Sequence, residues 1–244
     1  MDPNTHVHGP APGHDHACTI IFLHGRDSTA QELASELFES EASPNTATTD
    51  DQDLTLPGLL PSARWVFPSA PILRSQRFDI DMSQWFDMWY VEDPEEQPDI
   101  QRSGLDQSMQ TLRAVIEAEE KLITRDSMFV CGVSQGFATV VSQLIGGNEG
   151  GFAGLIGLCS WLPFAVEVEM MAPPAKLKST PIFLGHALDD EVVPIKNGQR
   201  MRNVLSQNLE LRVEWNVYED GGHWINEPQG VDDIVSFIKA NLKQ

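Results

Sequence analysis

The order of apolar and polar positions along the chain predicts strands and helices that alternate. Short, mostly apolar runs predict buried strands at residues 18–23, 64–67, 127–131, 152–158 and 181–184. Apolar and polar residues alternate over 211–217, which predicts a strand with one exposed face. Helices are predicted where apolar residues recur at helical spacing, over residues 29–39, 105–123, 135–145, 195–207 and 231–242.

Strands that alternate with helices form a mostly parallel sheet with helices packed on both of its faces. In such α/β sheets, reactive side chains gather at the carboxyl ends of the strands. The sequence contains no internal repeat and no credible linker, so we expect a single α/β domain over residues 17–244.

Three segments depart from this alternation. Residues 1–16 are rich in Pro, Gly and His and are expected to form a flexible tail. Their four histidines could bind a metal, but the spacing matches no closed site and the segment contains no Cys. A polar, acidic stretch around 40–60 predicts a surface insertion, and residues 72–100 predict an irregular segment rich in aromatic side chains.

Composition and charge exclude several classes of function. The chain carries 16 basic and 36 acidic residues, and this net charge of −20 would repel nucleic acids and anionic membrane surfaces. No window is long and apolar enough to span a membrane, and the first residues have neither the basic start nor the apolar core of a secretion signal. Three sparse cysteines in apolar surroundings indicate reduced thiols and a cytoplasmic protein.

The stretch FVCGVSQGFATVV, residues 129–141, places a Gly-x-Ser-x-Gly motif where a predicted strand passes into a predicted helix. A sharp strand-to-helix turn needs small neighbours, which Gly132 and Gly136 provide, and it holds the side chain of Ser134 out at the top of the sheet. This arrangement is the nucleophile elbow of α/β-hydrolases. The motif by itself also fits an ordinary glycine-rich turn, so the residues around it carry the interpretation.

A serine nucleophile needs a base and an acid, which in this fold follow it in the order acid, then histidine. Asp189 and Asp190 follow the predicted strand at 181–184, and the residues alone do not choose between them. His223 follows the last predicted strand, behind two glycines. We therefore expect Ser134 to attack an acyl carbon, His223 to transfer the proton, and one aspartate to orient the imidazole.

The tetrahedral intermediate needs two hydrogen-bond donors for its oxyanion. One is expected from the backbone N–H of Gln135 and the other from the loop after the first strand, His24-Gly25-Arg26. His24 is expected to hold that loop in shape by hydrogen bonding rather than to take part in catalysis directly.

Seven stretches carry a resemblance to a known family and appear in that family's order along the chain: FLHGRDS (22–28), FPSAP (67–71), SQWFDM (83–88), CGVSQGF (131–137), GLCSWLPF (157–164), HALDDEVVP (186–194) and DGGHW (220–224). The chain resembles the acyl-protein thioesterase and lysophospholipase/carboxylesterase family of small α/β-hydrolases. The Arg after His24-Gly25 and the long 40–60 region resemble its fungal branch.

The resemblance implies an α/β-hydrolase fold without a large cap, and a catalytic triad of Ser134, Asp190 and His223. It selects Asp190 over Asp189, because the acid follows four residues after the His of an H-x-x-x-D-x-x-V-P stretch. It assigns the oxyanion donors to the backbone N–H groups of Arg26 and Gln135. Substrate-binding candidates at matching positions are Trp161, Leu162 and Trp85.

Two positions depart from the family pattern. Asp27 stands where a Gly-containing turn is usual, and its charge would oppose an oxyanion if it points inward. Phe137 stands where a second Gly is usual and is expected to fill part of an acyl pocket. Arg74 and Arg77 are candidates to bind an anionic group of the substrate.

The leading hypothesis is a serine hydrolase that cleaves acyl esters or thioesters without a metal or cofactor. The expected substrate is a small molecule, a lipid or an acylated protein; no nucleic acid and no stable membrane insertion are expected, and a homodimer is left open. An alternative with the same triad is a specialised hydrolase of a small ester, lactone or carrier-bound thioester in secondary metabolism. A third hypothesis is a binding protein on an inactive hydrolase fold, which a serine-directed phosphonate would fail to label.

Overall fold

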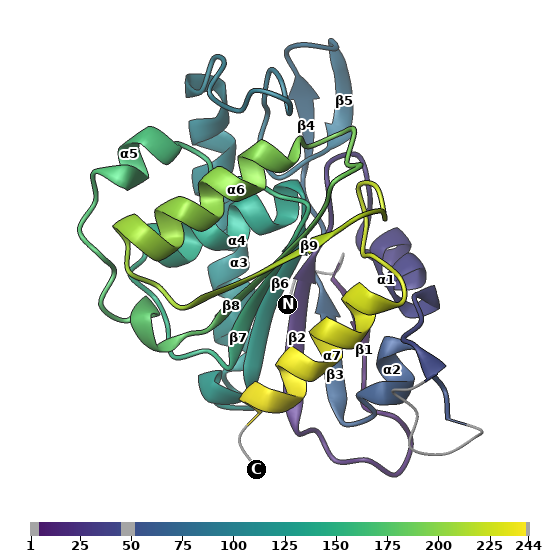
Figure 1. The fold of residues 1–244 in the computed structure, drawn as a ribbon. Coiled ribbons are helices and arrows are strands. Elements are labelled where there is room, and N and C mark those ends of the chain that lie inside the picture. Colours follow the sequence, from purple (N-terminus) through teal and green to yellow (C-terminus); the bar gives the residue numbers. More distant parts are fainter. Residues whose placement is uncertain (1–4, 45–51, 243–244) are drawn as a thin grey trace.

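The computed structural model describes residues 5–44 and 52–242 of the chain. Its centre is a seven-stranded sheet in the order β1-β3-β2-β6-β7-β8-β9 (Figure 1). All neighbouring strands are parallel except β1, which pairs with β3 in the antiparallel direction. The strands are β1 (His6–His8), β2 (Cys18–Leu23), β3 (Ala63–Phe67), β6 (Met128–Val133), β7 (Gly154–Leu158), β8 (Ile182–Ala187) and β9 (Val213–Tyr218). The predicted α/β-hydrolase architecture is confirmed.

Seven α-helices surround this sheet in the described part of the chain. They are α1 (Ala30–Glu39), α2 (Leu56–Leu59), α3 (Asp99–Glu119), α4 (Gln135–Gly146), α5 (Ala165–Glu169), α6 (Ile195–Asn203) and α7 (Gln229–Asn241). A π-helical turn, Val204–Asn208, continues α6, and short 3₁₀ turns lie at Arg125–Ser127 and Leu177–Ser179. Thr29 caps the N-terminus of α1: its hydroxyl accepts a hydrogen bond from the backbone N–H of Glu32 at 3.2 Å.

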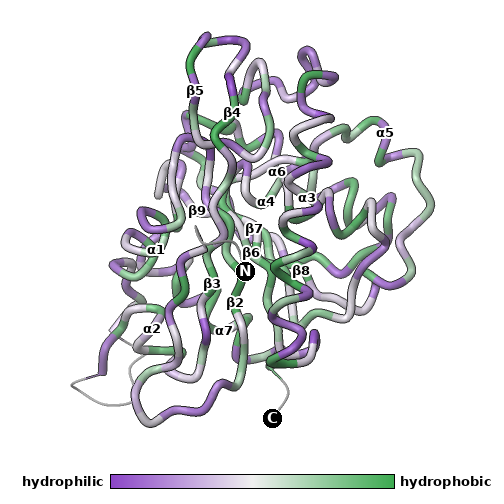
Figure 2. The backbone as a smooth tube through the Cα atoms, turned by 180° about the vertical axis from the view of Figure 1, so that it is seen from behind, coloured by the Kyte–Doolittle hydropathy of each residue, from purple (hydrophilic) through white to green (hydrophobic). Residues whose placement is uncertain are grey.

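Two apolar clusters fill the space on the two faces of the sheet. Because successive side chains of a strand point to opposite faces, Ile21 and Leu23 of β2 join one cluster and Ile20 and Phe22 join the other. Helices α3, α4 and α6 cover the first face, and α1 and α7 cover the second (Figure 1). Figure 2 shows the apolar residues concentrated in the central strands and the polar ones on the outer helices and loops.

The N-terminal segment is a correction to the sequence analysis. Residues 1–4 of the expected tail lie outside the described residues, but His6–His8 form strand β1, in which Val7 lies opposite Val66. Two of the histidines pack on aromatic rings: His6 lies 6.0 Å from Phe67 and His8 lies 5.1 Å from Phe38, measured between ring centroids. The segment extends the sheet because a polar strand is tolerated at a sheet edge.

The segment 72–100 is less irregular than expected. It contains a hairpin of β4 (Ile72–Ser75) and β5 (Ile80–Ser83), which stands out at the top of Figure 1. Helix α3 begins at Asp99, six residues before the predicted 105–123 helix.

The predicted insertion around 40–60 is partly described, since residues 45–51 lie outside the described ranges. The backbone N–H of Glu41 donates to Glu227 at 2.9 Å and that of Ser43 donates to Asp232 at 3.0 Å, so the start of the insertion is fastened to α7 and the loop before it. Thr55 pairs with Glu41 in an isolated bridge just before α2.

The three cysteines, Cys18, Cys131 and Cys159, are buried and unpaired, as predicted. Among the described residues, the helices are all too short or too polar to cross a membrane.

Candidate active site

Ser134 occupies the turn between β6 and α4 in a strained backbone conformation, with φ 54° and ψ −125°. The neighbouring glycines are required by close contacts: a Cβ on Gly136 would overlap the carbonyl oxygen of Leu23, and one on Gly132 would lie 2.5 Å from the backbone nitrogen of Phe137. The backbone N–H of Ser134 donates to Leu158 at 2.8 Å, which ties the turn to the neighbouring strand. The predicted elbow geometry is therefore present.

Asp190 and His223 meet at the carboxyl ends of β8 and β9. The Nδ1 of His223 lies 2.8 Å from Oδ2 of Asp190 and 3.1 Å from Oδ1. The backbone N–H groups of Val192 and Val193 donate to Oδ1 of Asp190 at 2.9 and 2.8 Å. These contacts fix the buried carboxylate from two sides and leave Nε2 as the free nitrogen of the His223 ring.

A second histidine approaches the same carboxylate. Nε2 of His186 lies 3.2 Å from Oδ2 of Asp190 and 2.9 Å from the carbonyl oxygen of Val193. Because a carbonyl oxygen only accepts, Nε2 of His186 carries the hydrogen and donates it. Burial raises the pKa of Asp190, but the hydrogen bonds from His186 and His223 outweigh burial and hold that pKa well below its usual range.

Asp189 has a separate task in the structure. Its side chain is exposed, yet its Oδ1 accepts a hydrogen bond from the backbone N–H of Gly222 at 2.8 Å. Gly222 precedes His223 and has a φ of 60°, in the left-handed region that favours glycine. Asp189 therefore fastens the loop that carries His223, a contact that the sequence analysis did not predict because it runs to the backbone.

Ser134 and His223 line one cavity, which we call the Ser134 cavity. Its volume is about 340 Å³, and most of its wall is apolar. The remaining lining residues come from the loop after β2, from α1, from the hairpin and the segment that follows it, from the end of β6, and from the loops after β7, β8 and β9. They are Gly25, Arg26, Asp27, Ser28, Leu33, Glu36, Phe78, Met82, Met88, Val91, Val133, Trp161, Val192 and Trp224. None of the described residues of the 40–60 insertion lines it.

The loop after β2 approaches Ser134 closely, since a Cβ on Gly25 would lie 3.6 Å from the Cβ of Ser134. His24 is fully buried and shapes this loop as predicted: its Nε2 accepts from the backbone N–H of Ala70 at 3.0 Å, so its Nδ1 carries the hydrogen and donates to Gly25 at 2.7 Å. Burial lowers the pKa of His24, which favours this neutral form.

Asp27 stands where the family pattern usually has a glycine-containing turn, and its backbone adopts a conformation that favours glycine. Its φ is 61°, in the left-handed region that Asp tolerates better than most residues, and its backbone N–H donates to Ser83 at 2.7 Å. The side chain of Arg26 reaches the hairpin, where it donates to Gln84 at 2.9 Å and to Ser75 at 3.0 Å. The backbone N–H of Arg26 is the one that the sequence analysis proposed as an oxyanion donor.

Gln135 is the first residue of α4, so its backbone N–H has no acceptor inside the helix. Its buried side chain has a role that sequence reasoning missed. Oε1 accepts from the backbone N–H of Trp85 at 2.9 Å, and Nε2 donates to the carbonyl oxygen of Phe86 at 2.7 Å. Gln135 thereby joins the elbow to the segment that follows the hairpin.

The expected substrate-binding residues divide into two groups. Trp161 lines the Ser134 cavity, whereas Leu162 lines two neighbouring cavities instead. Trp85 and Phe137 are fully buried and line none of these cavities. Trp85 donates from its indole to the carbonyl oxygen of His24 at 2.8 Å, and Phe137 fills the space above Gly157, so both are core residues in this structure.

The arginines expected to attract an anionic group are already engaged. Arg74 forms ion pairs with Asp79 at 2.6 Å and Asp81 at 3.4 Å. Arg77 donates to the carbonyl oxygen of Trp89 at 2.9 Å and stacks over the ring of Tyr90.

One group of potential metal ligands occurs among the described residues, and it coincides with the site. The ligand atoms of Cys159, Asp190 and His223 lie within 4.8 Å of one another. Burial, and then the charge of Asp190, raise the pKa of the Cys159 thiol far above its ordinary value. Because a metal binds the thiolate rather than the thiol, this cluster is poorly suited to a metal.

Comparisons with known proteins agree with this fold. Residues 52–242 match the family model described as phospholipase/carboxylesterase. Acyl-protein thioesterase 1 of Cryptococcus neoformans is 25% identical over 96% of both chains. The carboxylesterase SOBER1 of Arabidopsis thaliana is 32% identical over 75% of this chain and 79% of its own. The crystal structure of Zea mays acyl-protein thioesterase 2 superposes with a TM-score of 0.74 at 26% identity and covers 98% of this chain and 99% of the maize chain.

Proposed function

The chain belongs to the phospholipase/carboxylesterase family, and from that premise we propose that it hydrolyses acyl esters or thioesters through an acyl-enzyme on Ser134. The observation that carries the proposal is the elbow conformation of Ser134 in the same cavity as His223, whose Nδ1 lies 2.8 Å from Asp190.

Each residue of the triad has one role in the proposed reaction. The Oγ of Ser134 attacks the acyl carbon while Nε2 of His223 takes its proton. The bond from carbon to the leaving oxygen or sulfur then breaks, and His223 hands the proton to the leaving group. Water attacks the acyl-enzyme by the same route, which releases the carboxylic acid and restores Ser134.

Asp190 stabilises the imidazolium that His223 becomes in both steps. The low pKa of Asp190 keeps its carboxylate ionised across the working range of pH, so this support is always present. The backbone N–H groups of Arg26 and Gln135 are proposed to bind the oxyanion. The proximity of Gly25 to Ser134 and the position of Gln135 at the start of α4 support this assignment.

The Ser134 cavity favours an uncharged acyl group. Apolar side chains such as Leu33, Phe78 and Met82 line it. Its two acidic residues, Asp27 and Glu36, outnumber its one arginine, Arg26, whose side chain is held by Gln84 and Ser75, so an anionic group would be disfavoured. The side chains of Arg74 and Arg77 are already held by other groups, so they do not attract an anionic group to the cavity.

Three buried, unpaired thiols support a reducing compartment, so we propose that the protein is cytoplasmic.

The test is hydrolysis of 4-nitrophenyl esters from acetyl to palmitoyl by the wild type and by Ser134→Ala. The variant should lose about 10³- to 10⁶-fold in kcat while its thermal unfolding stays close to that of the wild type. A fluorophosphonate should label the wild type and not Ser134→Ala. Equal ester hydrolysis by both proteins would show that Ser134 is not the nucleophile, and absence of labelling in the wild type would favour a binding protein instead.

A further inference from the structure

The two residues that follow strand β7, Cys159 and Ser160, contact both the turn that carries Ser134 and the loop that carries His223. Each of the two is only 1% exposed, and neither lines the cavities described above. The substrate does not touch these side chains, so any effect that they have on the proposed reaction passes through their neighbours.

The side chain of Ser160 contacts the turn at Ser134. Its hydroxyl donates to the carbonyl oxygen of Ser134 at 2.7 Å, a far shorter contact than the 3.5 Å to the carbonyl oxygen of Trp161. The same Ser134 oxygen accepts from two backbone N–H groups in the first turn of α4, at 3.1 and 3.2 Å. The backbone N–H of Ser134 in turn donates to Leu158, the last residue of β7. Residues 158–160 thus hold the turn at both backbone groups of Ser134.

The side chain of Cys159 contacts the loop at His223. Its Sγ lies 3.4 Å from the carbonyl oxygen of Trp224 and 3.8 Å from that of Gly222, the two residues that flank His223. Burial raises the pKa of this thiol far above its ordinary value, so the sulfur keeps its hydrogen and can donate it. A thiol is a weak donor, and the nearer carbonyl, that of Trp224, is the better acceptor.

The backbone of Cys159 is strained at this point. Its φ is 49°, in the left-handed region that residues with a Cβ rarely adopt. Its N–H donates to the carbonyl oxygen of Gly185 in β8 at 2.9 Å. Backbone strain of this kind persists only where the surroundings impose it, and it is concentrated at functional sites.

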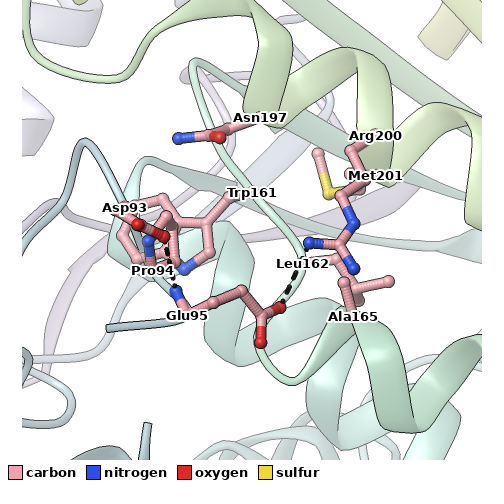
Figure 3. A pocket seen from close by; sticks show the side chains of 9 residues that line it. All are labelled: Asp93, Pro94, Glu95, Trp161, Leu162, Ala165, Asn197, Arg200 and Met201. Atoms are coloured by element: carbon pink, nitrogen blue, oxygen red, sulfur yellow. Dashed lines mark hydrogen bonds and ion pairs between the residues drawn. The ribbon is translucent and has the colours of Figure 1, made fainter. Parts of the chain in front are cut away.

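The chain after Ser160 is fixed as well. Trp161 and Leu162 are buried and form part of the wall of a small cavity, with a volume of about 50 Å³ (Figure 3). Arg200 and Glu95, which also line this cavity, form an ion pair at 3.4 Å (Figure 3). Cys159 and Ser160 therefore lie between strand β7 and a packed segment, and side chains on such a rigid support can fix the loops that they contact.

We propose that Cys159 and Ser160 are positioning residues that set the separation between the hydroxyl of Ser134 and the imidazole of His223. These two groups follow β6 and β9, which are not neighbours in the sheet, so no direct pairing of their strands fixes the spacing. The stretch after β7, which lies between them in the sheet, contacts both. This inference rests on the proposed function, because it assigns a role within that reaction.

The first experiment compares Cys159→Ala with Cys159→Ser in the hydrolysis of one 4-nitrophenyl ester. Cys159→Ala should lower kcat about 5- to 50-fold and change KM less than about twofold, because a misplaced base slows both steps. Cys159→Ser restores a donor and should recover most of that loss. A role in packing alone predicts the opposite order, since alanine replaces a buried, apolar cysteine better than serine does.

The second substitution removes the contact at the nucleophile. Ser160→Ala should lower kcat about 10- to 100-fold. If the two side chains form one support, the double variant Cys159→Ala/Ser160→Ala should cost little more than the larger single loss, because either change already releases the spacing. Cys18→Ala removes a buried thiol at the start of β2, the end away from Ser134, and should leave kcat unchanged.

Two outcomes of these kinetics would overturn the proposal. The first is Cys159→Ser that is no more active than Cys159→Ala. The second is a double variant whose loss equals the product of the two single losses, because the two side chains would then act independently. Thermal unfolding of each variant shows that the compared proteins are folded at the assay temperature.

A further measurement does not depend on turnover. The Nδ1–H proton of His223, which donates to Asp190, can be followed by NMR and assigned by its absence in His223→Gln. Its signal should be sharp in the wild type and in Cys159→Ser, and broadened in Cys159→Ala, where the loop moves. An unchanged signal in Cys159→Ala would contradict the proposal. If the wild type neither cleaves esters nor reacts with the fluorophosphonate, the proposed function fails, and this signal still decides whether Cys159 holds the loop.

Discussion

Asp189 and Asp190 are neighbours in the chain, yet they hold the loop that carries His223 at two different points. Asp190 is buried and contacts the ring of His223, whereas Asp189 is exposed and accepts from the backbone N–H of Gly222. Loss of the first contact should remove the support for the imidazolium. Loss of the second should only loosen the loop.

This difference predicts unequal effects for two adjacent substitutions. Asp190→Asn should lower kcat about 10³- to 10⁴-fold, because the amide neither stabilises the imidazolium nor keeps the correct tautomer of His223. Asp189→Ala should cost about three- to tenfold, the effect of one lost hydrogen bond. Steady-state kinetics on one 4-nitrophenyl ester checks both, and a larger loss in Asp189→Ala would move the role of catalytic acid to that residue.

The low pKa of Asp190 predicts a pH-dependent contribution to stability. The unfolded chain has an ordinary aspartate pKa of about 3.9, and the folded value lies below it, so the stabilisation is present above that pH and is lost as the pH falls toward the folded value. The unfolding free energy of the wild type should therefore fall relative to that of Asp190→Asn as the pH is lowered from about 5 to about 2.5. Urea unfolding at several pH values measures it, and a constant difference would contradict the assignment.

Two glycines of α4 should respond in opposite ways to the same substitution. Gly136→Ala places a methyl group against the carbonyl oxygen of Leu23, and we expect a loss of about 3 kcal/mol or more in unfolding free energy. Gly146→Ala meets nothing within 4 Å at the end of the helix and should stabilise by up to about 1 kcal/mol. Thermal and urea unfolding compare the pair; similar values for both would mean that the turn at Ser134 can relax.

Asp27 lines the Ser134 cavity, and its charge should oppose the negative charge that develops at the oxyanion. Asp27→Asn keeps a side chain that tolerates a positive φ and removes the charge, so kcat/KM should rise about two- to fivefold at low salt. The gain should shrink as salt is added, because screening weakens the repulsion in the wild type. A lower kcat/KM in Asp27→Asn would assign the carboxylate a supporting role instead.

The sequence predicted the elements whose pattern is strong and local. The apolar run before Ser134 predicts a buried strand, and the two glycines beside Ser134 predict a tight turn, so the local structure at this position could be predicted from the residues. The contact between His223 and Asp190 could be anticipated, because their order along the chain and the motifs around them are specific. The choice between Asp189 and Asp190 needed the family resemblance, since two adjacent carboxylates are equivalent in a sequence.

The missed features depend on contacts between distant segments. An apolar residue near a catalytic motif can face the cavity or the core, and Phe137 and Trp85 face the core because Gly157 and the loop at His24 leave room for them there. The side chain of Gln135 binds backbone groups about 50 positions away, and no local pattern reports such a bond.

The three-residue strand β1 forms one edge of the central sheet. A longer open strand would offer a row of unpaired N–H and C=O groups on which another chain could build. Here β1 covers the edge of β3 and is itself cut short by Gly9 and Pro10, and a proline has no N–H to offer a further strand. The segment that the sequence predicted to be a flexible tail thus covers the β3 edge of the sheet, and its removal would uncover β3.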